Sequence, residues 1–342
     1  MQRFGYMHLK VWISLSALSV AAPLVGQKHE VSVYGEGGLS TLHYSLPQEG
    51  SRQDQLGGGG GLGYAFLFAD YMGVATGVGL SAFRAGARLP GSFGSVAASI
   101  DEYDESFELR SSLSGYTEKQ SLITLSLPLM VHCQSGVLSG KYDKQLYFRA
   151  GLRLELPILG SYQSGIASLT NTIYYPEHKT TLSQPAYKGL GTFSGRVSSG
   201  SLNLALSATA CVEAGVKWDV SRRLPFNRNQ LPFNRLLSFN SRETSRNRRL
   251  MYLYTGIYFS YGLNDVLRGA DVGDVIHRSE DAPAEFRIGS LLTSRYEAES
   301  YFTGKALLIG GGITLRLSFN LSSQKQTSNY FSKTQAAQNA YR

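Results

Sequence analysis

Two of the six histidines, His178 and His277, lie in long polar segments and are the candidate general bases for hydrolysis. A hydrolytic site needs such a base within hydrogen-bond reach of a nucleophile or of an activated water. The carboxylates that could assist them are Asp101, Asp104, Asp265 and Asp274. These residues are scattered over different segments, and none falls in a recognised catalytic motif. The sequence therefore predicts no catalytic residues, with a hydrolase kept as an alternative.

The sequence also contains no motif for binding a metal or a cofactor. The two cysteines, Cys133 and Cys211, are too few for a disulfide framework, and alternation places them on opposite faces of two strands with another strand between them. A shared metal site at these thiols is excluded for the same reason. The glycine run Gly57–Gly61 lacks the Gly-Lys-Ser/Thr ending of a phosphate loop. We expect neither a metal nor a cofactor.

The composition limits the class of protein that could carry any site. Of 342 residues, 42% are hydrophobic and only 17% are charged, which argues against a disordered chain. After the N-terminus, no apolar run approaches the ~20 residues of a membrane-spanning helix. Residues 1–26 have the order of a signal peptide: Arg3 and Lys10, an apolar stretch from Val11 to Val25, then small residues up to Gly26. We expect the mature chain to be exported.

From Gln27 onward, the hydrophobic period is two rather than 3.6, which predicts strands. Between Ser201 and Val220, every even position is apolar or small, from Leu202 to Val220, whereas most odd positions are polar. Such strands are longer than those of soluble sandwiches. They suit a barrel that faces lipid outside and polar side chains inside, because only a closed barrel satisfies the backbone of strands in hydrocarbon.

Eight segments of this kind predict an all-β, antiparallel, up-and-down transmembrane β-barrel, with ten strands as the alternative if a connection hides a hairpin. The barrel occupies residues 27–320, and a polar tail follows at 321–342. Three long, polar connections, 87–118, 161–200 and 265–301, fall on the outer side. The eight segments are 29–45, 55–70, 71–86, 119–133, 145–160, 201–220, 250–264 and 302–319.

Alternation also assigns side chains to the inside and outside of this barrel. The second and third segments turn glycine and alanine inward, which leaves room for long charged side chains from the opposite wall. We interpret these charges as a paired structural network that fills the lumen; a narrow ion path is the alternative. The predicted lumen charge network is Arg149, Arg153, Glu155, Glu213, Lys217, Asp219 and Arg316. The predicted outward aromatic girdle is Trp218, Phe259, Tyr261 and Phe319.

The connection 221–249 holds most of the excess positive charge, with eight arginines against one glutamate. It also repeats the pentapeptide LPFNR at 224–228 and 231–235. We expect a periplasmic loop that is either a tolerated insertion or a surface for an acidic periplasmic partner. A nucleic-acid partner is excluded, because an exported barrel meets none and the loop has no recognised binding fold. Its arginines are Arg222, Arg223, Arg228, Arg235, Arg242, Arg246, Arg248 and Arg249.

The strand sequences resemble a known family. The resemblance rests on GGGGGLGYAFLF at 57–68, SLITLSLPLMV at 121–131, LYFRAGLRLELPIL at 146–159 and YLYTGIYFSYGLNDV at 252–266. The chain is similar to the outer-membrane β-barrel proteins of the Bacteroidetes, in the class of outer-membrane protein A-type or porin-like barrels. The final strand, ending in LSFN at 317–320, resembles the signal that the barrel-assembly machinery recognises. The tail is too short for a peptidoglycan-binding domain.

The resemblance implies a location but no specific activity. We expect an integral protein of a Gram-negative outer membrane, in contact with membrane lipid and lipopolysaccharide, with a structural or surface-interaction role carried by its loops. An extracellular ligand of those loops would be its partner. The alternatives are a narrow channel for ions or small solutes and an outer-membrane-embedded hydrolase.

Overall fold

The computed structural model describes residues 28–46, 50–101, 103–138, 144–186, 189–220, 251–267, 273–278, 286–296, 300–301 and 303–321. The predicted signal peptide, the basic connection 221–249 and residues 322–342 of the predicted tail lie outside these residues. In the part of the chain that is described, no helix has the length and apolar character needed to cross a membrane.

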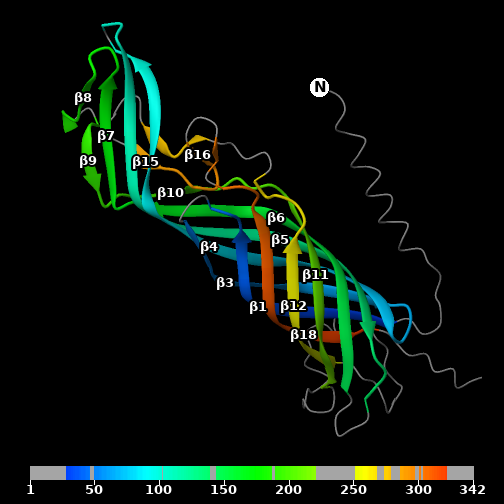
Figure 1. The fold of residues 1–342 in the computed structure, drawn as a ribbon. Coiled ribbons are helices and arrows are strands. Elements are labelled where there is room, and N and C mark those ends of the chain that lie inside the picture. The colour runs from blue at the N-terminus through cyan, green and yellow to red at the C-terminus, as the bar shows by residue number, and fades with distance from the viewer. Residues whose placement is uncertain are drawn as a thin grey trace, which may run out of the picture.

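Eight of the described strands close into one antiparallel ring (Figure 1). Each pairs with its neighbours in the ring, and the last strand closes on the first from Glu30↔Asn320 to His43↔Leu307. The prediction of an eight-stranded antiparallel barrel is confirmed, and the ring formed by the described residues does not have ten strands. In ring order the strands are β1 (Lys28–His43), β3 (Leu56–Leu67), β4 (Met72–Ile100), β5 (Ser106–Gln134), β6 (Lys144–Gly165), β11 (Ser207–Asp219), β12 (Met251–Gly262) and β18 (Leu307–Asn320).

The two ends of the barrel differ in their connections. At one end, β3 and β4 are joined by a tight turn in which Ala69 and Met72 exchange backbone hydrogen bonds of 3.1 and 3.4 Å. Lys28 binds Asp70 of this turn at 2.7 Å. We call this the turn end. We call the opposite end the hairpin end, because β4 and β5 continue there far beyond the ring (Figure 1).

The continuation of β4 and β5 corrects the prediction of a loop at 87–118. The two strands stay paired as far as Ile100↔Ser106, with one irregularity between Leu89 and Ser92. Near the ring, one face of this hairpin is buried in an apolar cluster that includes Leu89, Phe93 and Leu113. Toward the tip, from Val96 to Ile100, the side chains are exposed, so the backbone ladder there needs no apolar alternation. The polar, serine-rich sequence was therefore wrongly interpreted as a loop.

The predicted loop 161–200 likewise contains strands. One of them, β7, pairs with the β4–β5 extension from Glu108↔Tyr174 to Ser114↔Ser168. At the extension's tip, Asp101 accepts hydrogen bonds from the backbone N–H groups of Tyr103 and Glu105 and from the Tyr175 hydroxyl. The bond from the Glu105 amide lowers the pKa of the Asp101 carboxyl. We call this unit, made of the extension and the short strands beside it, the outer lobe; those strands are β7 (Ser168–Tyr175), β8 (Thr180–Leu182) and β9 (Gly191–Ser194).

Further short strands line the hairpin end. β2 (Ser51–Asp54) pairs with β4, and β10 (Val197–Ser201) pairs with β6. The remaining ones belong to the connection between β12 and β18: β13 (Gly273–Asp274), β14 (Ile276–Arg278), β15 (Phe286–Ile288), β16 (Ser294–Tyr296) and β17 (Ser300–Tyr301).

The start of β11 differs from the sequence prediction. The alternating pattern predicted a strand from residue 201, but β11 begins at Ser207. Leu202, predicted on the outward apolar face, is instead 4% exposed within an apolar cluster at the hairpin end. Alternation alone does not distinguish an apolar side chain facing lipid from one covered by another loop.

Candidate functional site

The inner face of the barrel is divided into a wall of small residues and a wall of long ones. A Cβ atom at Gly63 would lie 2.8 Å from Nη1 of Arg316, and one at Gly79 would overlap the hydroxyl of Tyr34. Glycines of β3 and β4 thus leave the space that Arg316 and Tyr34 occupy. The charges of the opposite wall lie in three layers, described from the turn end inward.

The first layer joins β1, β11 and β12. Lys217 donates to Glu30 at 2.7 Å, and both side chains are at most 3% exposed. The same carboxylate accepts from the hydroxyls of Tyr254 and Ser318 at 2.7 and 2.9 Å. Lys217 also donates to Gln134 at 3.0 Å. This ion pair is fully desolvated and has further hydrogen-bond partners on both sides.

The second layer surrounds Glu213. Its carboxylate accepts from the Tyr147 hydroxyl at 2.9 Å and from Arg316 at 3.2 Å. Arg149 lies 3.9 Å away and donates through Nε to His132 at 2.7 Å. Arg149 also lies over the Tyr254 ring, 5.1 Å from its centroid. Two arginines from different strands therefore share one carboxylate.

The third layer centres on Arg153. It binds both oxygens of Glu36 across the lumen, at 2.6 and 3.0 Å, and lies 3.9 Å from Glu155. Glu155 accepts from Thr124 at 2.6 Å and also from Ser126. A forked guanidinium–carboxylate contact of this kind fixes the relative positions of β1 and β6.

Most of the predicted network meets in these layers, together with partners that the prediction did not include. Six of its residues lie inside with the contacts given above: Arg149, Arg153, Glu155, Glu213, Lys217 and Arg316. Asp219 is partly exposed at the turn end of β11, opposite Tyr252. Sequence reasoning missed Glu30, Glu36 and His132. The alternating pattern could have identified the first two. Polar side chains at positions 30, 32, 34 and 36 alternate there with Val31, Val33 and Gly35.

The network is electrically balanced. Four basic side chains, at positions 149, 153, 217 and 316, face four carboxylates, at positions 30, 36, 155 and 213. A charge inside a membrane-crossing element is costly unless it is paired or hydrated. Each of these carboxylates has at least one basic partner within 4 Å, so the described part of the lumen leaves no large excess charge to compensate.

The hairpin end of the lumen is closed by an apolar cluster. It combines inward residues of the ring with residues from connections folded over the mouth. Tyr44, which belongs to it, donates to Gln120 at 2.9 Å. We call this cluster the apolar plug; it consists of Leu42, Tyr44, Phe83, Ala85, Leu122, Leu202, Val266, Leu292, Ala306 and Leu308.

Glu118 ties the covering connection to the wall. Its carboxylate accepts from the Tyr116 hydroxyl at 2.9 Å, from Gln120 at 3.0 Å, from the backbone N–H of Leu291 at 2.9 Å and from the Ser290 hydroxyl. Glu118 is 3% exposed. The donors of Ser290 and Leu291 thus hold residues 290–291 against β5, while Tyr116 and Gln120 of β5 fix the carboxylate.

The outer surface of the ring is an apolar belt that includes every one of the eight strands. Its members are exposed although they are large and apolar; Leu129 is 62% and Ile257 68% exposed. Monomeric soluble proteins rarely expose a continuous apolar surface of this size. One or two representatives from each strand, in ring order, are Val33, Leu62, Leu80, Leu129, Leu152, Leu154, Val212, Ile257 and Ile313.

The predicted aromatic girdle lies on this outer surface. Trp218 and Phe319 lie near the turn end of their strands, and Trp218 donates through Nε1 to Thr255 at 3.0 Å. Phe259 and Tyr261 lie toward the hairpin end of β12 and are 50% and 44% exposed. The four aromatics therefore fall near the two edges of the apolar belt.

The two candidate bases do not meet, although Asp101 and His178 both lie beside Tyr175 at the tip of the outer lobe. His178 lies 3.4 Å from Glu105 in the outer lobe, whereas His277 lies in β14 of a different connection. Among the described residues, no three His, Cys, Asp or Glu side chains are grouped as metal ligands would be. Cys211 is buried inside the barrel and Cys133 is partly exposed, and neither forms a disulfide.

No protein-family model matches the chain, and no curated protein matches it. Among solved structures it is similar to the outer membrane protein OprG from Pseudomonas aeruginosa, with 9% identity, a TM-score of 0.30, and coverage of 87% of this chain and 97% of that one. It is also similar to Ail, the attachment invasion locus protein of Yersinia pestis, solved alone and with the heparin analogue sucrose octasulfate. These two matches have 7% and 8% identity and TM-scores of 0.23 and 0.24; each covers 87% of this chain and all of that one. Similarity at this level does not identify a family.

Proposed function

We propose that this protein is an integral outer-membrane β-barrel with a closed lumen, and that its specific role is structural or one of surface interaction, carried by the outer lobe. The observation that carries the proposal is the inversion of polarity across the wall. All eight strands present apolar side chains outward, while the lumen holds a balanced set of charges. A water-soluble barrel buries its apolar side chains inside, whereas a barrel in lipid exposes an apolar outer band around a polar interior.

The dimensions of the belt support insertion into a bilayer. On β5, outward apolar side chains run from Cys133 to Ile123. Ten residue steps at ~3.3 Å give about 33 Å of strand, which a tilt of ~40° reduces to ~25 Å of height. This is the height of the apolar band of outer-membrane barrels.

The connections set the orientation. Outer-membrane barrels have short periplasmic turns and long extracellular loops. The turn end is therefore assigned to the periplasm and the outer lobe to the cell exterior. We propose with it that residues 1–26 are a cleaved signal peptide, and that the protein is one of the Bacteroidetes outer-membrane barrels that its strand sequences resemble.

A closed lumen supports a structural or surface role over a channel. An eight-stranded barrel has an interior just wide enough for side chains to fill. Three layers of paired charges and the apolar plug occupy successive levels of that interior. An ion would have to separate Glu213 from Arg316 and then pass an apolar layer. The barrel thus serves as a rigid support for the lobe, for which an extracellular ligand is the proposed partner.

We further propose that the protein is not an enzyme. The support is the separation of the two candidate bases and the exposure of His178, whose side chain is 59% exposed beside Glu105. Lipid or peptide turnover that is lost in His178→Ala or His277→Ala would contradict this proposal.

Fractionation of cells tests the location. The protein should remain in the outer membrane after carbonate washing, because the belt is embedded in lipid. It should also migrate differently on gels before and after boiling, since a closed barrel resists detergent. Release of the folded protein into the soluble periplasm would overturn the proposal.

A further inference from the structure

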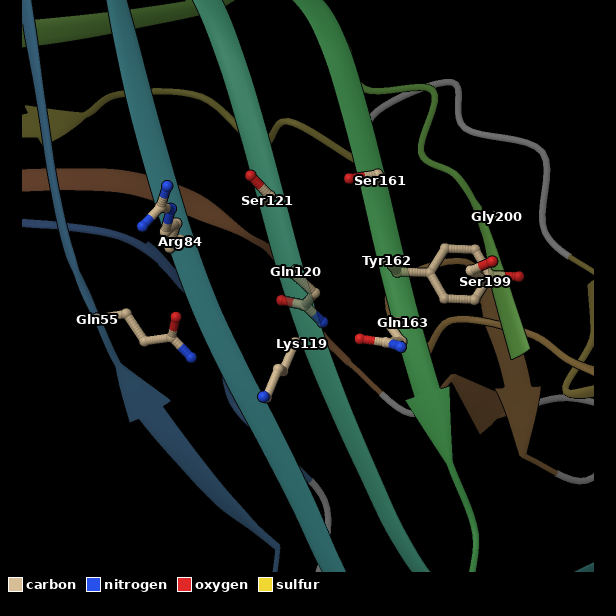
Figure 2. A pocket seen from close by; sticks show the side chains of 10 residues that line it. All are labelled: Gln55, Arg84, Lys119, Gln120, Ser121, Ser161, Tyr162, Gln163, Ser199 and Gly200. Atoms are coloured by element: carbon tan, nitrogen blue, oxygen red, sulfur yellow. The ribbon is translucent and has the colours of Figure 1, made fainter. Parts of the chain in front are cut away.

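A polar hollow lies on the outside of the barrel wall, toward the hairpin end of the apolar belt (Figure 2). Its volume is about 700 Å³, and its lining comes from β4, β5, β6 and β10, with Gln55 from the segment between β2 and β3. The lining includes two basic side chains, Arg84 and Lys119, several amides and hydroxyls, and no carboxylate.

The hollow begins where the belt ends. The last apolar row on this side contains Ile123, paired with Ala82 and Leu159. Two residues closer to the hairpin end of β5, Ser121 pairs with Arg84 on β4 and with Ser161 on β6. Two residues span roughly 7 Å of strand, so the basic row lies at the level where hydrocarbon gives way to lipid headgroups.

Three basic side chains surround one glycine at this level. Arg84 and Arg88 flank Gly86 on the outward side of β4, and Lys119 of β5 pairs directly with Gly86. All three basic side chains are exposed, and none forms an ion pair with another described residue. Within the described structure, their charge is therefore available to an anion.

Gly86 leaves room for the side chain of Gln55, which lines the hollow. A Cβ atom there would lie 3.3 Å from Nε2 of Gln55 and 3.4 Å from Cβ of Gln53. Gln163, the partner of Lys119 on β6, adds a second amide, and Figure 2 shows Gln55, Lys119 and Gln163 along the same stretch of wall. Guanidinium, ammonium and amide N–H groups around one space suit the several oxygens of a phosphate group.

We propose that this hollow binds the phosphate of a lipid headgroup in the outer leaflet of the membrane. The proposal rests on the membrane insertion proposed above. A lipid is favoured over a soluble phosphate because the hollow continues directly into the apolar belt. A lipid whose headgroup is bound in the hollow would place its acyl chains against Leu80, Ile123 and Leu159. One lipid molecule would thus contact both the polar hollow and the apolar belt.

Titration of the purified full-length protein in micelles with a bis-phosphorylated glycolipid, lipid A, tests the proposal. Arg84→Gln combined with Lys119→Gln should weaken binding roughly thirtyfold, because each basic side chain near a lipid surface contributes a severalfold attraction. Gly86→Val should also weaken binding, since it displaces the Gln55 amide that lines the hollow without changing the charge. The matched control, Lys179→Gln combined with Lys305→Gln, removes two exposed basic groups elsewhere and should bind like the unmodified protein.

Two further probes separate the sources of phosphate. Dephosphorylated lipid A and inorganic phosphate should each bind far more weakly than lipid A. Equal affinity of the double variant and the control, or equal affinity for the dephosphorylated lipid, would overturn the proposal. Inorganic phosphate binding as tightly as lipid A would also overturn it.

Gel migration before and after boiling, together with flotation of the protein with vesicles, separates this proposal from the membrane proposal. A heat-modifiable protein that floats but shows no preference for lipid A refutes the headgroup site alone. A protein that does not float refutes the membrane proposal, and the headgroup site with it.

Discussion

Glu213 is the residue on which the lumen network depends most. It accepts hydrogen bonds from Tyr147 and Arg316, and Arg149 lies 3.9 Å away, so its removal leaves two buried guanidinium groups without their carboxylate. Removing one partner of a buried ion pair lowers the stability of a protein strongly, because the remaining charge stays buried without a partner.

We therefore predict that Glu213→Ala lowers the free energy of unfolding by ~3 kcal/mol, measured by urea titration of the refolded barrel. Glu177→Ala, at an exposed turn of the outer lobe, is the matched control and should change stability little. Equal stabilities of the two variants would contradict the account of a desolvated network.

Glu118 has the corresponding role at the hairpin end, where it holds Ser290 and the backbone of Leu291. Glu118→Ala should release residues 286–296 from β5 and leave the barrel intact. Hydrogen exchange at the Leu291 amide should then accelerate at least about tenfold, because a hydrogen bond to a charged group contributes ~1.5 kcal/mol or more. Glu108→Ala, which removes an exposed partner of Arg110, should leave that amide unchanged. Unchanged exchange in Glu118→Ala would show that the apolar plug alone holds the connection.

At the scale of elements, the alternation of apolar and polar residues predicts the ring strands well. Each of these strands has an exposed apolar outer face and a packed inner face. All eight predicted segments correspond to strands of the ring. The tip of the β4–β5 extension was missed because a hairpin in water is not required to alternate. Its base was missed because Leu89, Phe93 and Leu113 are covered by other connections, and the sequence does not give the position of those connections. Strands β7 to β10 have only three to eight residues each, too few to show a long alternating pattern.

Alternation also predicts which side chains enter the lumen, but it does not predict their partners. Arg153 meets Glu36, 117 positions away in the chain, and Lys217 meets Glu30, 187 positions away. These pairs cross the lumen between strands that are not neighbours in the ring. Their contact depends on strand stagger and barrel closure, which a single sequence does not specify.

The basic connection 221–249 lies outside the described residues, and its role remains a prediction. Deleting 224–247 should leave the barrel folded and its co-purifying proteins unchanged, because Pro225 and Pro232 disfavour a central strand there. Gel migration and pull-down from solubilised membranes measure both properties. Loss of one co-purifying protein at normal barrel yield would instead support an acidic periplasmic partner. Loss of the folded barrel would show that the connection contains a structural strand.

On the scale of the whole molecule, the barrel combines an apolar outer belt, an interior with balanced charges and a lobe beyond the ring. The belt supports the proposed insertion into a membrane, and the three charge layers with the apolar plug support the proposal that the interior is closed. The lobe, supported by the continuous strands β4 and β5, is the part that extends farthest from the belt (Figure 1). Any specific interaction with the exterior is therefore assigned to the lobe.

Single-channel recording in planar lipid bilayers tests the closed, membrane-inserted barrel most directly. The reconstituted protein, with insertion verified by its resistance to carbonate extraction, should show little steady conductance. The physical reason is that conduction requires Glu213 and Arg316 to separate and the apolar plug to open. Large, stable single-channel currents from the unmodified protein would contradict the closed lumen and favour a channel for ions or small solutes.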